Sequence, residues 1–233
     1  MFDHVTIRVS DRTGSRRFYG LALGEPLYDG DFVDWGELSL VEGSVPSRRL
    51  HLAFGVAERT DVDAWWRRMV EAGYTSDGEP GPRPQYGATY YGGFVLDPDG
   101  NSVEAVHHHT SRTDALDHLW LRSRDVAAQK RFYETVAPAV GLRVAHDEPA
   151  RVRFTDGEGS FTFVAGEPVT ENVHLAFAAR DRETVHEFHR AAVAAGYRDN
   201  GEPGERPQYH PGYYAAYVLD ADGHNVEAVF HDR

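Results

Sequence analysis

The chain of 233 residues contains one sequence unit written twice. Residues 50–106 align without gaps on residues 173–229, and the two segments share Ala-Gly-Tyr, Gly-Glu-Pro-Gly, Arg-Pro-Gln-Tyr and Tyr-Tyr in the same order. Nearer the start of each copy, Phe2-Asp3-His4-Val5 matches Leu116-Asp117-His118-Leu119. A repeat of this length indicates a tandem duplication. We therefore predict two domains, residues 1–109 and 116–233, joined by a polar linker at 110–115.

Each copy alternates strand and helix patterns. Residues 5–9 alternate apolar and polar side chains, which is typical of a strand with one buried face, and residues 11–19 have a helical pattern. Strands are expected at 38–41 and 50–56, and an amphipathic helix at 61–72 is expected to end at Gly73. Residues 94–96 and 103–106 flank a clear turn, Asp97-Pro-Asp-Gly-Asn101, and form a hairpin. The predicted class is α+β, with four modules that each pack helices on one face of a curved sheet and leave the other face for a cavity.

The composition limits which side chains can bind a metal and which partners and compartment are expected. The absence of cysteine excludes disulfides, thiolate metal sites and a cysteine nucleophile, so a metal must be held by His and carboxylate side chains. The formal charge of −13 disfavours nucleic acid and anionic membranes as partners. A strand pattern begins almost at Met1, and no long apolar run follows, so we expect a cytoplasmic protein.

Strand periodicity places histidines on the face opposite the core. If Val5 and Ile7 are buried, His4 points the other way, and His51 has the same relation to Leu50 and Leu52. His118 and His174 repeat this arrangement, and Glu104 and Glu227 stand among apolar neighbours at equal distances from the second histidine of each copy. Two imidazoles and a carboxylate are the ligand set of an open metal site. An isolated histidine on a strand is more often structural, but the recurrence of all six positions favours two metal centres.

These residues resemble the vicinal oxygen chelate superfamily, which includes glyoxalase I, fosfomycin- and bleomycin-resistance proteins and extradiol ring-cleaving dioxygenases. The most specific parts are the strand histidines and the closing motif Asp97-Pro-Asp-Gly-Asn-Ser-Val-Glu104, matched by Asp220-Ala-Asp-Gly-His-Asn-Val-Glu227. The resemblance implies two glyoxalase-like domains of paired βαβββ modules, each enclosing a metal cavity. It also implies a divalent metal, Fe(II), Zn, Ni, Co or Mn, held by His4, His51, Glu104, His118, His174 and Glu227.

The resemblance leaves the reaction open between glyoxalase-like lyase or isomerase chemistry and extradiol-like dioxygenation. Glyoxalase I uses a fourth protein ligand, for which Glu37 is the nearest candidate, whereas the aligned segment Ser160-Phe-Thr-Phe163 offers only hydroxyls. Extradiol enzymes use three ligands with a His and a Tyr beside them, and His210 and Tyr217 approach that pattern as catalytic residues. The first copy has Gly87 and Phe94 at these places, so the second copy is expected to be the active one.

We therefore expect a metal-dependent enzyme acting on a small substrate that chelates the metal through neighbouring oxygens. The alternative is a protein that binds or sequesters a small antibiotic or toxin. Site assembly is open: His4 can join His51 and Glu104 in its own copy, or the first strands can be exchanged so that His4 meets His174 and Glu227. Because Trp65 and Trp66 are adjacent on one helix and cannot both be buried, a homodimer is the simplest role for the exposed ring.

Overall fold

The computed structural model describes residues 1–113 and 116–232, so Asp114 and Ala115 of the predicted linker lie outside the described residues. The first repeat contains, in chain order, β1 (Phe2–Val9), α1 (Arg12–Leu23), β2 (Tyr28–Asp29), β3 (Val33–Asp34), β4 (Leu38–Glu42), β5 (Leu50–Gly55), α2 (Arg59–Glu71), β6 (Ser76–Pro82), β7 (Tyr91–Leu96) and β8 (Ser102–His107). The second repeat contains β9 (Leu116–Ser123), α3 (Val126–Val140), β10 (Arg143–Glu148), β11 (Arg151–Thr155), β12 (Ser160–Ala165), β13 (Val173–Ala178), α4 (Arg182–Ala194), β14 (Arg198–Glu205), β15 (Tyr213–Leu219) and β16 (Asn225–His231).

This order is a βαβββ module repeated along the chain, and it confirms the predicted α+β class. The chain forms two compact units: unit 1 comprises residues 1–6 and 122–233, and unit 2 comprises residues 7–121. In unit 1 the strands β14, β15, β16, β13 and β1 are neighbours in that order, and in unit 2 the corresponding order is β6, β7, β8, β5 and β9. Both sheets are mixed, because β13 pairs with β16 in parallel and β15 pairs with β16 antiparallel, as do their counterparts in unit 2.

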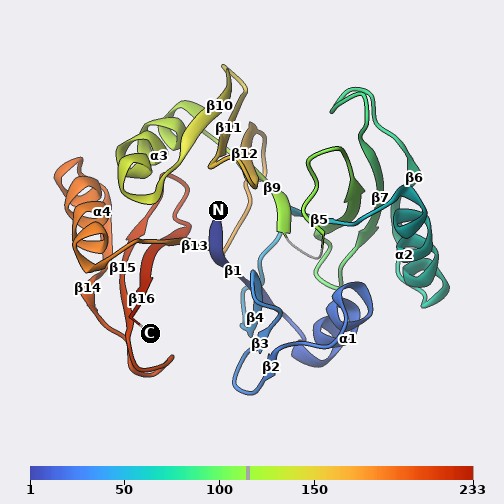
Figure 1. Ribbon diagram of the computed structural model, residues 1–233, viewed down its shortest axis with the longest axis horizontal. Coiled ribbons are helices and arrows are strands. Elements are labelled where there is room, and N and C mark those ends of the chain that lie inside the picture. Colours follow the sequence, from blue (N-terminus) through green and yellow to red (C-terminus); the bar gives the residue numbers. More distant parts are fainter. Residues whose placement is uncertain (114–115, 233) are drawn as a thin grey trace. The chain divides into compact units, whose positions relative to one another are not determined.

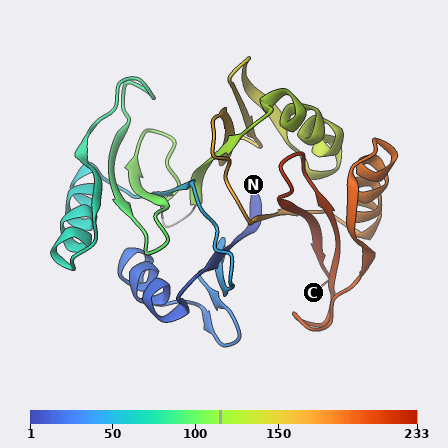
Figure 2. The same ribbon diagram turned by 180° about the vertical axis from the view of Figure 1, so that it is seen from behind.

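One helix of each unit packs against three neighbouring strands of its sheet. Figures 1 and 2 show α4 alongside β14–β16 and α2 alongside β6–β8. The alternation predicted for β1 is confirmed: Val5, Ile7 and Val9 are almost fully buried, while His4 is partly exposed. The opposite face of β5 is less open than expected, because Ala53 is fully buried and Gly55 packs against the backbone of Arg112.

The helix predicted at 61–72 begins two residues earlier than expected. Glu58 is its N-cap and forms a reciprocal capping box with Asp61, so Thr60 lies inside the first turn. Gly73 follows the C-cap at a φ of 94°, as the predicted helix end requires. No described helix is long and apolar enough to cross a membrane.

The turn at residues 97–101 is held by its first aspartate. Asp97 accepts hydrogen bonds from the backbone N–H groups of Asp99 and Asn101, at 2.9 and 2.8 Å, and from the Tyr19 hydroxyl at 2.9 Å. The side-chain amide of Asn101 donates to it as well, at 3.0 Å, and also to the backbone carbonyl of Ser47 at 2.9 Å. Asp220 accepts the corresponding bonds in unit 1 from Asp222, His224 and Tyr133. The repeated closing motif therefore joins the last hairpin of each repeat to the helix that follows its first strand.

We expect Asp97→Ala to lower the free energy of unfolding by about 2–4 kcal/mol, because it leaves several buried donors unpaired. Denaturant unfolding followed by circular dichroism measures this change. Asp77, which is exposed, provides the matched control, and Asp77→Ala should stay within about 0.5 kcal/mol of the wild type. Equal stability of the two variants would contradict the structural role given to Asp97.

Candidate functional site

Two groups of His and Glu side chains within the described residues can each hold a metal ion. The His4 site comprises His4, His174 and Glu227, all in unit 1, and the His118 site comprises His51, Glu104 and His118, all in unit 2. Within each group one ligand atom per residue lies within 4.8 Å of the others. All six sequence-predicted ligand residues are thus brought together, three to a group.

Strand register explains how distant residues converge. In unit 2, Ala53 on β5 is directly opposite Glu104 on β8 and directly opposite His118 on β9. His51 lies two residues earlier on the same face of β5. The small side chain of Ala53 therefore lies between Glu104 and His118, and it leaves room for these two side chains to approach one another. In unit 1, Ala176 is opposite Glu227 in the same way.

The His4 site is built around the Glu227 carboxylate, which is only 1% exposed. His174 Nε2 lies 2.8 Å from Glu227 Oε2 and 3.2 Å from His4 Nε2, and His4 Nε2 lies 3.7 Å from the same carboxylate oxygen. The Tyr213 hydroxyl donates to the other oxygen, Oε1, at 2.7 Å. One carboxylate oxygen is thus held by Tyr213 while the other faces both imidazoles.

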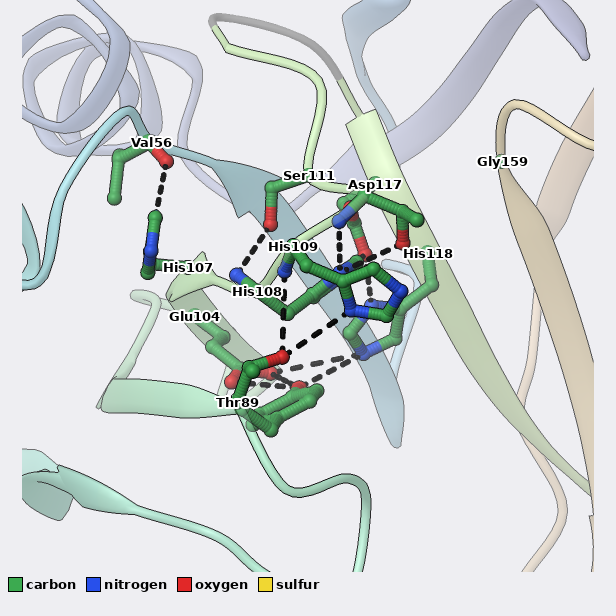
Figure 3. Close-up of polar contacts among 12 residues, drawn as sticks. Val56, Thr89, Glu104, His107, His108, His109, Ser111, Asp117, His118 and Gly159 are labelled. Carbon is green, nitrogen blue, oxygen red and sulfur yellow. Dashed lines mark hydrogen bonds and ion pairs between the residues drawn. The ribbon is translucent and has the colours of Figure 1, made fainter.

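The His118 site has nearly the same distances. His51 Nε2 is 2.9 Å and His118 Nε2 is 3.6 Å from Glu104 Oε2, and Glu104 is fully buried. Figure 3 shows Glu104 and His118. The Tyr90 hydroxyl is within hydrogen-bonding distance of both carboxylate oxygens, at 2.8 and 2.9 Å. Gly92 makes room for this carboxylate, because a Cβ at that position would overlap Glu104 Oε1.

The outward nitrogens of the four histidines are also engaged. His4 Nδ1 is 2.9 Å from Asp3 Oδ1, and His118 Nδ1 is 2.7 Å from Asp117 Oδ1. On the second histidine of each group, His51 Nδ1 contacts the Ser102 hydroxyl at 3.2 Å, and His174 Nδ1 contacts the Asn225 side-chain amide at 2.7 Å. Every Nδ1 in the two groups is therefore directed away from the carboxylate, and every Nε2 is directed toward it.

Electrostatics keep the surrounding aspartates ionised and the tyrosines protonated. Burial by itself would raise the pKa of Asp3, but hydrogen bonds and charge from His4 and His231 outweigh it and hold the pKa below its usual value. The pKa of Asp117 is lowered in the same way, against burial, by hydrogen bonds from His108 and His118. Burial, followed by the charge of the adjacent glutamate, raises the pKa values of Tyr90 and Tyr213 far above the ordinary tyrosine value. Both tyrosines are therefore hydrogen-bond donors at neutral pH.

The surroundings of the two groups differ at two predicted catalytic positions. Tyr217 is directly opposite Glu227 in the β15–β16 register, and Phe94 is opposite Glu104 in unit 2. The Tyr217 hydroxyl oxygen is buried and has no hydrogen-bond partner among the described residues, and burial beside Glu227 raises its pKa well above the ordinary value. His210 is hydrogen-bonded to the Pro211 carbonyl at 2.8 Å through Nδ1 and lies 2.9 Å from His231 Nδ1 through Nε2. Its link to the His4 site runs through His231 and Asp3.

The structure answers the question of site assembly that the sequence leaves open. His4, from the first repeat, meets His174 and Glu227 from the second, so the first strands are exchanged between the repeats. Glu37 belongs to neither group. Its carboxylate forms an ion pair with Arg112 and accepts the Leu116 backbone N–H at 2.8 Å. The role of Glu37 seen in the structure is therefore to hold the chain at the start of β9.

Sequence reasoning missed the residues that support the ligands. Asp3 and Asp117 stand within the repeated tetrapeptides, and Tyr90 and Tyr213 within the repeated Tyr-Tyr pair, so recurrence was the available signal. His108 contacts Asp117 at 3.1 Å. His231 contacts Asp3 at 2.9 Å in the same way. Both histidines stand two residues beyond the aligned segments, at matching positions of the two copies.

The donor sets fit a divalent metal. Two neutral imidazole nitrogens and one carboxylate oxygen are ligands of Fe(II), Zn and neighbouring first-row metals. A carboxylate as buried as Glu104 or Glu227 is costly without a compensating positive charge. A bound dication supplies that charge, and the Nδ1 contacts of His4 and His118 with aspartate carboxylates leave the Nε2 lone pairs of these two histidines available to it.

Fold and site together define a class: an α+β protein of repeated βαβββ modules with paired His-His-Glu groups. The sequence profile of the Glyoxalase/Bleomycin resistance protein/Dioxygenase superfamily matches residues 1–105 and 115–228. The chain belongs to this superfamily.

Solved structures agree with this fold. Glyoxalase I from Zea mays is 20% identical, with 99% of this chain and 92% of that chain covered and a TM-score of 0.69. A candidate dioxygenase from Bacillus subtilis is 15% identical, with 100% of this chain and 85% of that chain covered and a TM-score of 0.71. No curated protein sequence matches the chain.

Proposed function

We propose that this chain is a divalent-metal-dependent enzyme whose active centre is the His4 site, and that it cleaves a small aromatic substrate bound through two neighbouring oxygens, as extradiol dioxygenases do. The observation that carries this proposal is Tyr217, whose buried hydroxyl makes no close hydrogen bond among the described residues and lies on the strand position opposite Glu227. The metal ligands in this proposal are His4, His174 and Glu227 in one centre and His51, Glu104 and His118 in the other.

The donor set supports three-ligand chemistry. A set of two histidines and one carboxylate leaves positions open for substrate and dioxygen, and it is the set that non-haem Fe(II) oxygenases use. The fourth acidic ligand of a glyoxalase-type centre would have to come from a residue such as Glu37, whose carboxylate is already engaged by Arg112 and the Leu116 N–H. Fe(II) held by His4, His174 and Glu227 would supply a Lewis acid for a chelating substrate and a centre for oxygen chemistry.

The chain's own residues have separable roles in this reaction. Tyr213 fixes Glu227 by holding Oε1, so that Oε2 stays directed at the imidazoles. Tyr217 keeps its proton at neutral pH, because burial and the Glu227 charge raise its pKa, and it donates that O–H to a developing negative charge on a substrate oxygen. The role predicted for His210, carrying a proton, stays a prediction, and the hydrogen-bonded sequence His210, His231, Asp3 and His4 supports it.

Metal loading combined with oxygen uptake tests the proposal. The chain is freed of metal, loaded anaerobically with Fe(II), Mn(II), Co(II), Ni(II) or Zn(II) in separate samples, and mixed with a panel of catechols. We expect oxygen uptake equal to ring-cleaved product with a redox-active metal and none with Zn(II). Turnover without oxygen on any of these metals would instead assign lyase or isomerase chemistry. Tight binding of a small molecule by metal-free chain, without turnover, would assign a binding protein.

A further inference from the structure

In the His4 site and in the His118 site, an aspartate directly precedes the histidine after which the site is named. The pairs are Asp3-His4 on β1 and Asp117-His118 on β9. Successive side chains on a strand point to opposite faces, so neighbours do not ordinarily meet. Here both carboxylates reach the Nδ1 atom of the next residue, at 2.9 and 2.7 Å.

A second histidine from a distant strand holds each aspartate in place. His231, the last residue of β16, lies 2.9 Å from Asp3 Oδ2. His108, directly after β8, lies 3.1 Å from Asp117 Oδ1, and Figure 3 shows it between the Glu104 side chain and Asp117. Asp117 is only 6% exposed, so this carboxylate is fixed by its surroundings and is not a mobile surface group.

The partners of the other two ligand histidines differ from these. His51 and His174 contact a neutral hydroxyl and a neutral amide, and these partners differ between the units. The carboxylate partner, in contrast, recurs on His4 and on His118. A carboxylate that accepts Nδ1–H fixes the imidazole tautomer, orients the ring and increases the basicity of Nε2.

We propose that Asp3 and Asp117 are positioning residues that hold the His4 and His118 imidazoles with Nδ1–H toward the carboxylate and the Nε2 lone pair toward Glu227 and Glu104. This inference rests on the proposed function insofar as it assigns the two groups to metal binding. Beyond that function, it assigns one carboxylate–imidazole pair to each centre. Both residues of each pair lie on the first strand of a repeat.

The two centres serve as controls for one another. Asp3→Asn and Asp117→Asn are each made in the full chain, and Co(II) binding is followed by visible absorption in competition with a chelator. We expect each variant to weaken Co(II) binding at its own centre by about 10–100-fold and to leave the other centre unchanged. Asp77→Asn, at an exposed position, should change neither. Unchanged affinity in both Asn variants, or equal weakening of both centres by either one, would overturn the inference.

A second measurement needs no metal. Nitrogen-15 NMR of the metal-free wild-type chain, at a pH where its imidazoles are neutral, should show His4 and His118 as Nδ1–H tautomers, and each Asn variant should shift the affected ring toward a mixture. Nε2–H tautomers in the wild type would refute the positioning role. If the wild type shows the expected tautomers yet binds no Co(II), the positioning role stands and the proposed metal-dependent function fails.

Discussion

Replacing Glu227 with glutamine should remove one of two bound metal ions per chain and nearly all turnover, whereas Glu104→Gln should remove the other ion and spare most of the turnover. Glutamine keeps the shape of the side chain and the hydrogen bond from Tyr213, but it removes the anionic oxygen that lies 2.8 Å from His174 Nε2. Loss of a charged ligand should weaken metal binding at that centre by more than about 100-fold, since changing a supporting residue alone costs about 10–100-fold. Turnover should fall by about 1000-fold or more, because the metal contributes several kcal/mol to the reaction.

Metal content by elemental analysis and oxygen uptake measure the two effects independently. The pair of variants is well matched, because both carboxylates are almost fully buried and both contact a His Nε2 at closely similar distances. Retention of two ions in both variants would refute ligand roles for these glutamates. Equal loss of turnover in both would place the reaction at both centres and would contradict the assignment of the active centre to the His4 site.

Local patterns predicted the faces of the strands well. The alternation around Val5 placed His4 on the non-core face, and the Asp97 turn and the Gly73 helix end lie where the residue types require them. These features depend on neighbours within a few residues, so a pattern along the chain is sufficient to find them.

Contacts between distant segments could not be predicted in the same way. The sequence around His4 does not indicate whether its partner is His51 or His174, because strand pairing depends on packing between modules of similar sequence. The structure selects His174, which is 170 residues away. The contact of Asp117 could not be predicted for a different reason. Strand alternation directs its side chain away from His118, but in the structure the carboxylate turns back to Nδ1.

Tyr217→Phe should lower kcat by about 100- to 10,000-fold while leaving the metal affinity of the His4 site unchanged, the range typical for loss of a group that donates or accepts a proton. The hydroxyl oxygen is buried and makes only a weak interaction with Glu227, without a close hydrogen bond among the described residues, so its removal should disturb this ligand little. Tyr213, which does hold Glu227, is left in place. A large loss of kcat with intact metal binding would therefore report on a contact made with the substrate.

The sign of the pKa shift gives this prediction a pH dependence. Burial, then the Glu227 charge, raises the pKa of Tyr217, so the protonated form persists above the pH at which an ordinary tyrosine ionises. The kcat of the wild type should accordingly show no decline from tyrosine ionisation up to about pH 10, near the ordinary tyrosine value. Phe94→Tyr supplies the matched change in the His118 site, where a hydroxyl is introduced opposite Glu104. If Tyr217→Phe retains full kcat, the reaction does not use this hydroxyl, and the buried Tyr217 hydroxyl no longer supports the dioxygenase proposal.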